Sequence, residues 1–114
     1  MTTTSTQGLG LAVFARMRAH PGQRAQLVDA LQPLVASGER ESGTTAYLLH
    51  ESVEDPDVVW FYARFTDQQA LDAHQANEAS LATEAAAIGQ YLAEAPIVEY
   101  GTVRSDKHTP PGTH

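Results

Sequence analysis

The stretch VVWFYARFTDQQALDAHQANE, residues 58–78, contains the change of periodicity that decides the fold. Its first part, Val58 to Phe65, is a run of apolar, β-branched and aromatic residues with the length of a strand. Thr66, with Gln69 three residues later, matches a capping box, which predicts that a helix starts here and runs through His74. A strand therefore passes directly into a short amphipathic helix that carries a histidine near its end.

Similar elements lie on both sides of this stretch. Periodicity predicts further strands and helices over Leu9–Arg18, Gln23–Glu41, Thr45–Ser52, a run from a cap at Asn77 to Pro96, and Ile97–Arg104. The turn sequence VEDPD makes the two middle strands a hairpin, and Pro33 predicts a kink or a break near residues 30–32. The order β-α-β-β-α-α-β is an α+β, ferredoxin-like arrangement with helices on one face of an antiparallel sheet. One domain over residues 9–104 is expected, between flexible polar tails at 1–8 and 105–114.

The two faces of the predicted sheet differ in character. Alternate residues of the first and third strands make one wholly apolar face, which should lie under the helices. The other face carries Phe14, Trp60 and Tyr62 beside arginines. This face is too aromatic for solvent and too charged for a sealed core, so it favours packing against another sheet. Because one chain supplies only one sheet, the sequence predicts a homodimer.

The composition argues against several classes of protein. Lys and Arg total 7 against 14 Asp and Glu, and the net charge of −7 opposes binding to nucleic acid or anionic lipid. The chain has no cysteine, which excludes disulfides and thiolate chemistry, and its 5 histidines show no metal-ligand spacing. No apolar run approaches the ~18 residues that span a bilayer. The polar N-terminus lacks the features of a signal peptide, so a soluble cytoplasmic protein is expected.

Three segments together resemble the antibiotic biosynthesis monooxygenase family of dimeric α/β barrels. They are VFARMRAHPGQRAQLVDAL at 13–31, SGTTAYLLHESVEDPD at 42–57 and WFYARFTDQQALDAH at 60–74. The third segment, from an aromatic strand end through TD to DAH, is the most specific of them. The resemblance implies a homodimer whose sheets meet in a barrel, with a pocket between sheet and helices in each subunit.

The resemblance also implies a kind of chemistry. Several members oxygenate polycyclic aromatic or quinol substrates without flavin, haem or metal, so no cofactor is expected. Related branches degrade haem or bind signalling molecules. Ala15 and Phe65 stand where haem-degrading members have asparagine and tryptophan, and Phe61 stands where aromatic polyketide oxygenases have asparagine. His74 matches the histidine of the AH motif in quinol-oxidising members, which makes it the candidate catalytic residue.

Cofactor-free oxygenation needs an apolar pocket, a base and a hydrogen bond to the developing oxyanion. His74 suits the base because an unperturbed imidazole titrates near ~6.5. The candidate substrate-binding residues are Phe61, Phe65 and Leu71 for the apolar wall, and Tyr47 and Tyr91 for the hydrogen bond.

Other interpretations stay open at this point. The same pocket could bind an aromatic or hydrophobic small molecule without turnover, or could serve an isomerase or lyase acting on an enolisable substrate. His74 could instead stabilise the helix dipole or be satisfied by a backbone carbonyl. Its spacing from Ala70 and Leu71 places it on the stripe facing the sheet. We therefore expect His74 to border a cavity, with at least one ring nitrogen free of protein partners.

Overall fold

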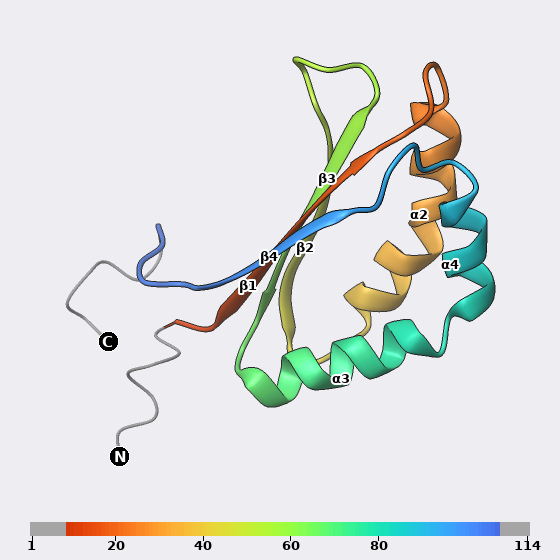
Figure 1. The fold of residues 1–114 in the computed structure, drawn as a ribbon. Coiled ribbons are helices and arrows are strands. Elements are labelled where there is room, and N and C mark those ends of the chain that lie inside the picture. The colour runs from red at the N-terminus through yellow and green to blue at the C-terminus, as the bar shows by residue number, and fades with distance from the viewer. Residues whose placement is uncertain (1–8, 108–114) are drawn as a thin grey trace.

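The computed structural model describes residues 9–107, so the predicted N-terminal tail and residues 108–114 lie outside the described part. The described residues form four strands and three helices in the order β-α-β-β-α-α-β (Figure 1). The elements are β1 (Leu11–Arg18), α2 (Arg24–Glu39), β2 (Thr44–Glu51), β3 (Val58–Phe65), α3 (Gln68–Ala79), α4 (Ala82–Gly89) and β4 (Ile97–Thr102). This confirms the predicted α+β, ferredoxin-like arrangement.

The four strands form one antiparallel sheet in the order β2-β3-β1-β4. The register pairs Val13 of β1 with Ala63 of β3 on one side and with Tyr100 of β4 on the other. On the opposite side of β3, Tyr47 of β2 also pairs with Ala63. These residues therefore form one row across the sheet, and the pleat turns their side chains to the same face.

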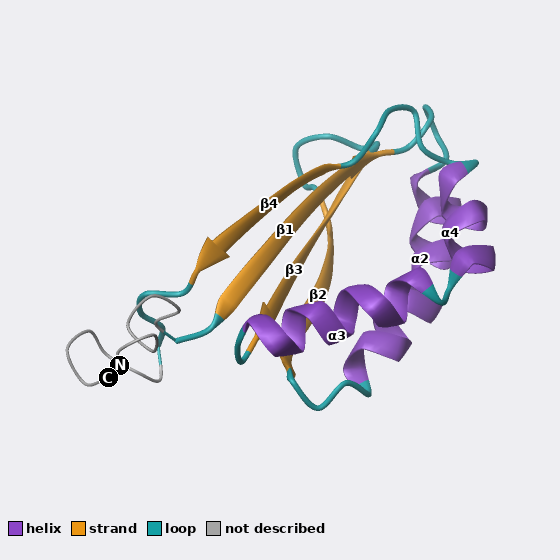
Figure 2. Cartoon of the chain, turned by 60° about the horizontal axis from the view of Figure 1, so that its bottom comes forward, coloured by secondary structure: helices purple, strands orange, loops and turns teal. Residues whose placement is uncertain are grey.

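All three helices lie on one face of the sheet, and the other face is bare (Figure 2). The covered face is the apolar one that alternation predicts, with Met17, Val59 and Phe61 buried under α2 and α4. A second buried cluster forms where α3 crosses the sheet, and there Phe65 and Leu71 meet. Each such side chain stabilises the fold by ~1.5–3 kcal/mol when it is fully removed from water.

Two predicted helix caps were wrong. The N-cap of α3 is Asp67, whose Oδ1 accepts a hydrogen bond from the backbone N–H of Ala70 at 2.9 Å. The backbone N–H of Thr66 donates to the carbonyl of Gly43 at 3.0 Å, so it is not available to the Gln69 side chain as a capping box requires. Asn77 does not start a second helix either; it lies inside α3, and α4 follows Leu81 without a side-chain cap.

Of the kink or break predicted near Pro33, the break did not occur, since α2 continues through this residue as one helix. Proline removes the N–H that would bond to the carbonyl of Asp29. Both residues are exposed, so water can satisfy that carbonyl and the helix tolerates the loss. Over residues 9–107, no helix is long and apolar enough to cross a membrane.

Candidate functional site

A cavity of about 170 Å³ opens between α3 and the covered face of the sheet. We call it the inner cavity. Strand residues supply most of its apolar wall and two tyrosine hydroxyls, and α3 supplies its other polar groups. Its lining residues are Val13, Ala15, Tyr47, Phe61, Ala63, Leu71, His74, Gln75, Glu78, Val98 and Tyr100. The cavity forms because α3 covers β2 and β3, while no helix covers the neighbouring part of β4 (Figures 1 and 2).

His74 lies in the wall of the inner cavity and is buried. Its ring packs against the rings of Phe65 and Tyr47, with centroids 4.9 Å and 5.6 Å away. Nδ1 lies 2.8 Å from Oε1 of Glu41, and Nε2 lies 3.2 Å from Oε2 of Glu78. The expectation of a ring nitrogen without a protein partner was therefore wrong. A carboxylate only accepts hydrogen bonds, so both contacts are hydrogen bonds only when the ring is an imidazolium with a proton on each nitrogen.

Glu41 holds His74 from behind the cavity. Its carboxylate accepts hydrogen bonds from Thr44 Oγ1 at 2.7 Å, from His74 Nδ1 at 2.8 Å and from Asn77 Nδ2 at 2.6 Å. Burial alone would raise the pKa of the Glu41 carboxyl, but these three donors outweigh it and hold the pKa below its ordinary value. Glu41 is therefore a fixed anion that orients the imidazole.

Glu78 differs from Glu41 because it stands at the rim, with its side chain 42% exposed. It follows His74 by one helical turn, which places both side chains on one side of α3. Its Oε2 also accepts a hydrogen bond from the Tyr47 hydroxyl at 3.4 Å. One exposed carboxylate thus covers Nε2 of His74, which is the ring nitrogen that Glu41 leaves available.

The charges around His74 shift two further pKa values. Burial alone would lower the pKa of the His74 imidazolium, but hydrogen bonds and attraction from Glu78 and Glu41 raise it above its ordinary value. Burial raises the pKa of the Tyr47 phenol above its usual range, and Glu78 adds to that rise. Tyr47 is therefore a neutral hydrogen-bond donor at the cavity wall.

The position of Tyr47 depends on a glycine. Gly38, near the end of α2, is buried, and a Cβ built there would collide with the ring carbons of Tyr47. The ring therefore lies directly against the backbone of α2. The hydroxyl of this ring is the group that donates a hydrogen bond to Glu78 Oε2.

The structure separates the five predicted substrate-binding residues into two groups. Tyr47, Phe61 and Leu71 line the inner cavity together with His74. Phe65 does not line it; it is fully buried and supports the His74 ring. Tyr91 does not line it either. It follows α4, where its carbonyl accepts a hydrogen bond from the backbone of His20 at the far end of the sheet.

Sequence reasoning missed Glu41, Glu78 and Gln75. Glu78 had a readable signal, because a glutamate four residues after a histidine shares its helix face. Glu41 had none, since nothing in the local pattern shows that the turn after α2 brings its carboxylate back under α3. Gln75 lies beside Tyr100 across the open side of the cavity, where its Nε2 donates to the Tyr100 hydroxyl at 3.3 Å.

The inner cavity adjoins a more open groove of about 370 Å³ between α3 and β4. Leu71, Gln75 and Tyr100 line both. Beyond these shared residues, the groove is lined by Leu11, Gln68, Gly101 and Thr102. A flat molecule of several rings could therefore place one end at His74 and extend outward along α3.

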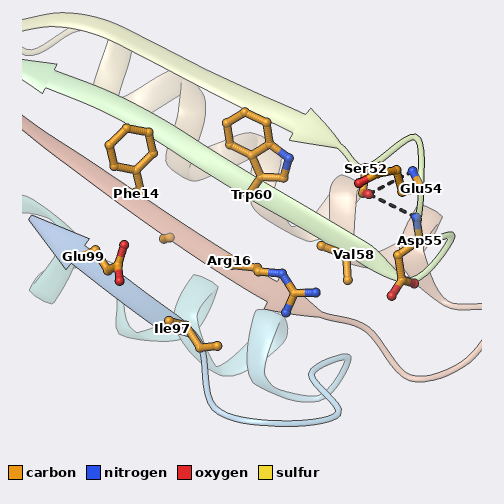
Figure 3. A pocket seen from close by; sticks show the side chains of 10 residues that line it. Phe14, Arg16, Ser52, Glu54, Asp55, Val58, Trp60, Ile97 and Glu99 are labelled. Carbon is orange, nitrogen blue, oxygen red and sulfur yellow. Dashed lines mark hydrogen bonds between the residues drawn. The ribbon is translucent and has the colours of Figure 1, made fainter.

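A larger groove, of about 550 Å³, lies on the bare face of the sheet (Figure 3). Phe14 and Trp60 project into it from β1 and β3, with Arg16 and Glu99 nearby. The Trp60 ring also stacks on His50 with centroids 3.8 Å apart. This outer groove is separated from His74 by the thickness of the sheet. Across residues 9–107, no three histidine or carboxylate side chains gather as they would around a metal ion.

Comparison with solved structures places the fold among small proteins of several bacteria. The chain is 30% identical to NE2512 from Nitrosomonas europaea, a protein of unknown function, with a TM-score of 0.72 over 89% of this chain and 95% of that one. Rv0793 from Mycobacterium tuberculosis is 25% identical, with a TM-score of 0.74 and coverage of 85% and 97%. SnoaB from Streptomyces nogalater, a cofactor-independent oxygenase solved as the N63A mutant, is 17% identical, with a TM-score of 0.75 and coverage of 88% and 98%.

No protein of curated function matched the sequence. The profile of the family described as antibiotic biosynthesis monooxygenase matches residues 10–86, which include β1 to β3, α2, α3 and most of α4. This match covers well over half of the chain and contains every residue that bonds His74. The chain therefore belongs to the antibiotic biosynthesis monooxygenase family.

Proposed function

We propose that the protein is a cofactor-independent monooxygenase acting on a quinol-like or polycyclic aromatic compound in the inner cavity. The observation that carries this proposal is the pair formed by Glu41 and His74 in the cavity wall. A carboxylate on Nδ1 fixes the orientation of the imidazole and stabilises the imidazolium that forms when Nε2 takes a proton. The family supports the same class of reaction.

Each part of the cavity has a task in this reaction. Phe61, Leu71 and the adjoining groove provide an apolar surface for the rings of the substrate. In its neutral form, with its proton on Nδ1 toward Glu41, His74 accepts a proton from the substrate at Nε2 after the substrate has displaced Glu78 from that nitrogen. Tyr47, held neutral by burial, donates a hydrogen bond to the substrate oxygen as negative charge develops there.

The reaction balances without an added electron donor when the substrate has an acidic methylene next to aromatic rings, as in an anthrone. Loss of one proton to His74 leaves a carbanion that passes one electron to O2. The resulting radicals combine into a peroxide anion, which takes back the proton. Loss of water then leaves a ketone, so one oxygen atom of O2 enters the product and the other leaves as water.

One observation favours a second function. Both ring nitrogens of His74 are occupied by carboxylates, so the histidine serves as a structural element until a ligand removes Glu78. A domain that binds a hydrophobic small molecule without turnover would need nothing more. The alternative of an isomerase or lyase on an enolisable substrate uses the same base and differs only in not consuming O2.

Oxygen uptake separates these functions. The purified full chain would be given anthrones and hydroquinones with no added flavin or metal, and O2 consumption and products would be followed together. Turnover that falls by roughly 10²-fold in His74→Ala supports the monooxygenase. Saturable binding without O2 uptake or product supports the binding domain, and product without O2 uptake supports the isomerase or lyase.

We also propose that the working unit is a homodimer closed over the bare face of the sheet. Phe14, Leu48 and Ile97 are 45%, 48% and 53% exposed on that face, beside the stacked pair of Trp60 and His50. An apolar surface of this kind is typical of an interface. Two such faces packed together would make the α/β barrel and leave both inner cavities open at α3.

A further inference from the structure

The charges lining the inner cavity are unbalanced, and the imbalance restricts what the cavity can bind. His74 is the single lining residue that can carry a positive charge; no Lys or Arg lines the cavity. Against it stand Glu78 in the lining and Glu41 directly behind the ring. With the imidazolium formed, the cluster of these three residues keeps one net negative charge.

We propose that Glu78 determines the selectivity of this cavity: it admits a neutral aromatic compound with a hydroxyl group and rejects the same ring system bearing a carboxylate. The proposal rests on the proposed function, because it assumes that the ligand of the inner cavity reaches His74. It goes beyond that function by assigning a selective role to Glu78, the carboxylate at the rim that contacts Nε2.

The geometry explains the preference. Nε2 of His74 and Oε2 of Glu78 face each other at 3.2 Å, so a ligand can reach Nε2 only by entering between them. A hydroxyl can both donate and accept, and it can therefore bond to the carboxylate of Glu78 and to Nε2 together. A ligand carboxylate can only accept, and it would face the Glu78 carboxylate with no cation besides His74 to offset the repulsion.

Glu78 is also able to give way. It lies at the rim, its side chain is 42% exposed, and its second contact within the cavity is a long 3.4 Å hydrogen bond from the Tyr47 hydroxyl. Glu41 is the contrasting case, since three short hydrogen bonds fix its carboxylate. Glu78 therefore selects ligands by their charge, and Glu41 fixes the orientation of the His74 ring.

The test compares two probes of one shape, 2-naphthol and 2-naphthoate, at neutral pH, where the first is neutral and the second is an anion. Their affinities for the full chain would be measured by calorimetry, and the NMR signals of the His74 ring would report whether the probe lies beside it. We expect the wild type to bind naphthol at least roughly tenfold more tightly than naphthoate, because juxtaposed like charges oppose binding. Glu78→Gln keeps the size of the side chain and should reduce that ratio by roughly tenfold, mainly through tighter binding of naphthoate.

Glu39→Gln is the matched control. It removes the same charge from an exposed glutamate that lines none of the grooves around α3, and it should leave the ratio unchanged. Equal affinity of the wild type for both probes, with the His74 signals shifted, would overturn the selectivity while leaving the cavity as a binding site. If neither probe binds, both the selectivity of Glu78 and the use of the cavity as a binding site are overturned. This experiment measures binding and not turnover. A failure of the oxygenase proposal is therefore detected separately, as the absence of O2 uptake with the proposed substrates.

Discussion

Glu41 and His74 are 33 residues apart in the sequence, yet their Oε1 and Nδ1 atoms lie 2.8 Å apart. The contact joins the turn after α2 to the middle of α3, and Asn77 adds a second bond to the same carboxylate one helical turn later. One carboxylate thus ties two elements together and sets the orientation of the candidate base. Stability and proposed activity therefore both depend on Glu41.

Replacing Glu41 by alanine should destabilise the fold by ~1–3 kcal/mol, because Asn77 and His74 lose their buried acceptor. Urea unfolding followed by circular dichroism measures this change. Glu39→Ala, at an exposed position two residues earlier, is the control and should stay within ~0.5 kcal/mol of the wild type. Equal stability of the two variants would contradict the structural role of Glu41.

Glu41→Gln should lower turnover more than it lowers substrate affinity. A glutamine oxygen can still accept from Nδ1, but it no longer stabilises the imidazolium that forms when Nε2 takes a proton. We expect a fall of roughly tenfold or more in kcat with little change in KM. The pKa of His74, followed by NMR, should fall at the same time. A role limited to packing would leave that pKa unchanged.

The raised pKa of His74 gives stability and activity opposite pH dependences. Because the folded pKa lies above the unfolded value, the attraction to Glu41 and Glu78 is fully present below ~6.5 and is lost as the pH rises through the folded pKa. Glu41 has a lowered pKa, so its contribution is present above its ordinary value of 4.5 and is lost as the pH falls through the folded value. The cluster therefore stabilises most between these two ordinary values.

The pH dependence of activity should be opposite to that of the stability contributed by His74. A base must be unprotonated, so turnover should rise with pH and level off above the raised pKa of His74. The pH profile of kcat/KM, compared with the NMR titration of His74, checks this. In Glu78→Gln the rise should move to lower pH because one of the two carboxylates is gone. A profile that does not move would show that another group controls the rate.

The sequence predicted the sheet well because alternation encodes which face is buried. The bounds predicted for Val58–Phe65 match β3, and its alternate residues do lie under the helices. Helix ends were less predictable. Thr66 and Asp67 are both good N-caps by residue type, and residue type does not show that the Asp67 side chain is the one that bonds to the backbone N–H of Ala70.

The candidate site was predicted only where it depends on periodicity. Leu71 and His74 share a helix stripe, and both line the inner cavity. The partners of His74 could not be predicted in the same way, since Glu41 arrives from a turn whose path depends on the packing of α2 against the sheet. Tyr91 was a wrong candidate for the opposite reason. Its residue type made it a possible hydrogen-bond donor, but the loop after α4 places it at the other end of the sheet, beside His20.

Gly38→Ala should move Tyr47 out of place. The new Cβ would meet the ring carbons of Tyr47, and overpacking of this kind costs ~1–3 kcal/mol. The displaced hydroxyl would also leave Glu78, so turnover should fall as well. Gly89→Ala is the matched helical control, since a Cβ there meets nothing within 4 Å. It should stabilise the protein slightly, by ~0.5–1 kcal/mol. If Gly38→Ala were as stable as Gly89→Ala, the close packing of Tyr47 against Gly38 would be contradicted.

The bare face of the sheet gives the last prediction. If a second copy covers it, Leu48→Asp and Trp60→Asp would each bury a carboxylate without a partner, which costs several kcal/mol, and the dimer should dissociate. Leu48 is the cleaner probe because it is 48% exposed in the single chain, whereas Trp60 also stacks on His50. Val53→Asp is the control, since Val53 is fully exposed in the turn between β2 and β3 and lines neither groove. Light scattering at micromolar concentration should give a dimer for the wild type and the control, and a monomer for the other two variants. A monomer mass for the wild type would rule out the proposed barrel, and the aromatic face would then need another partner.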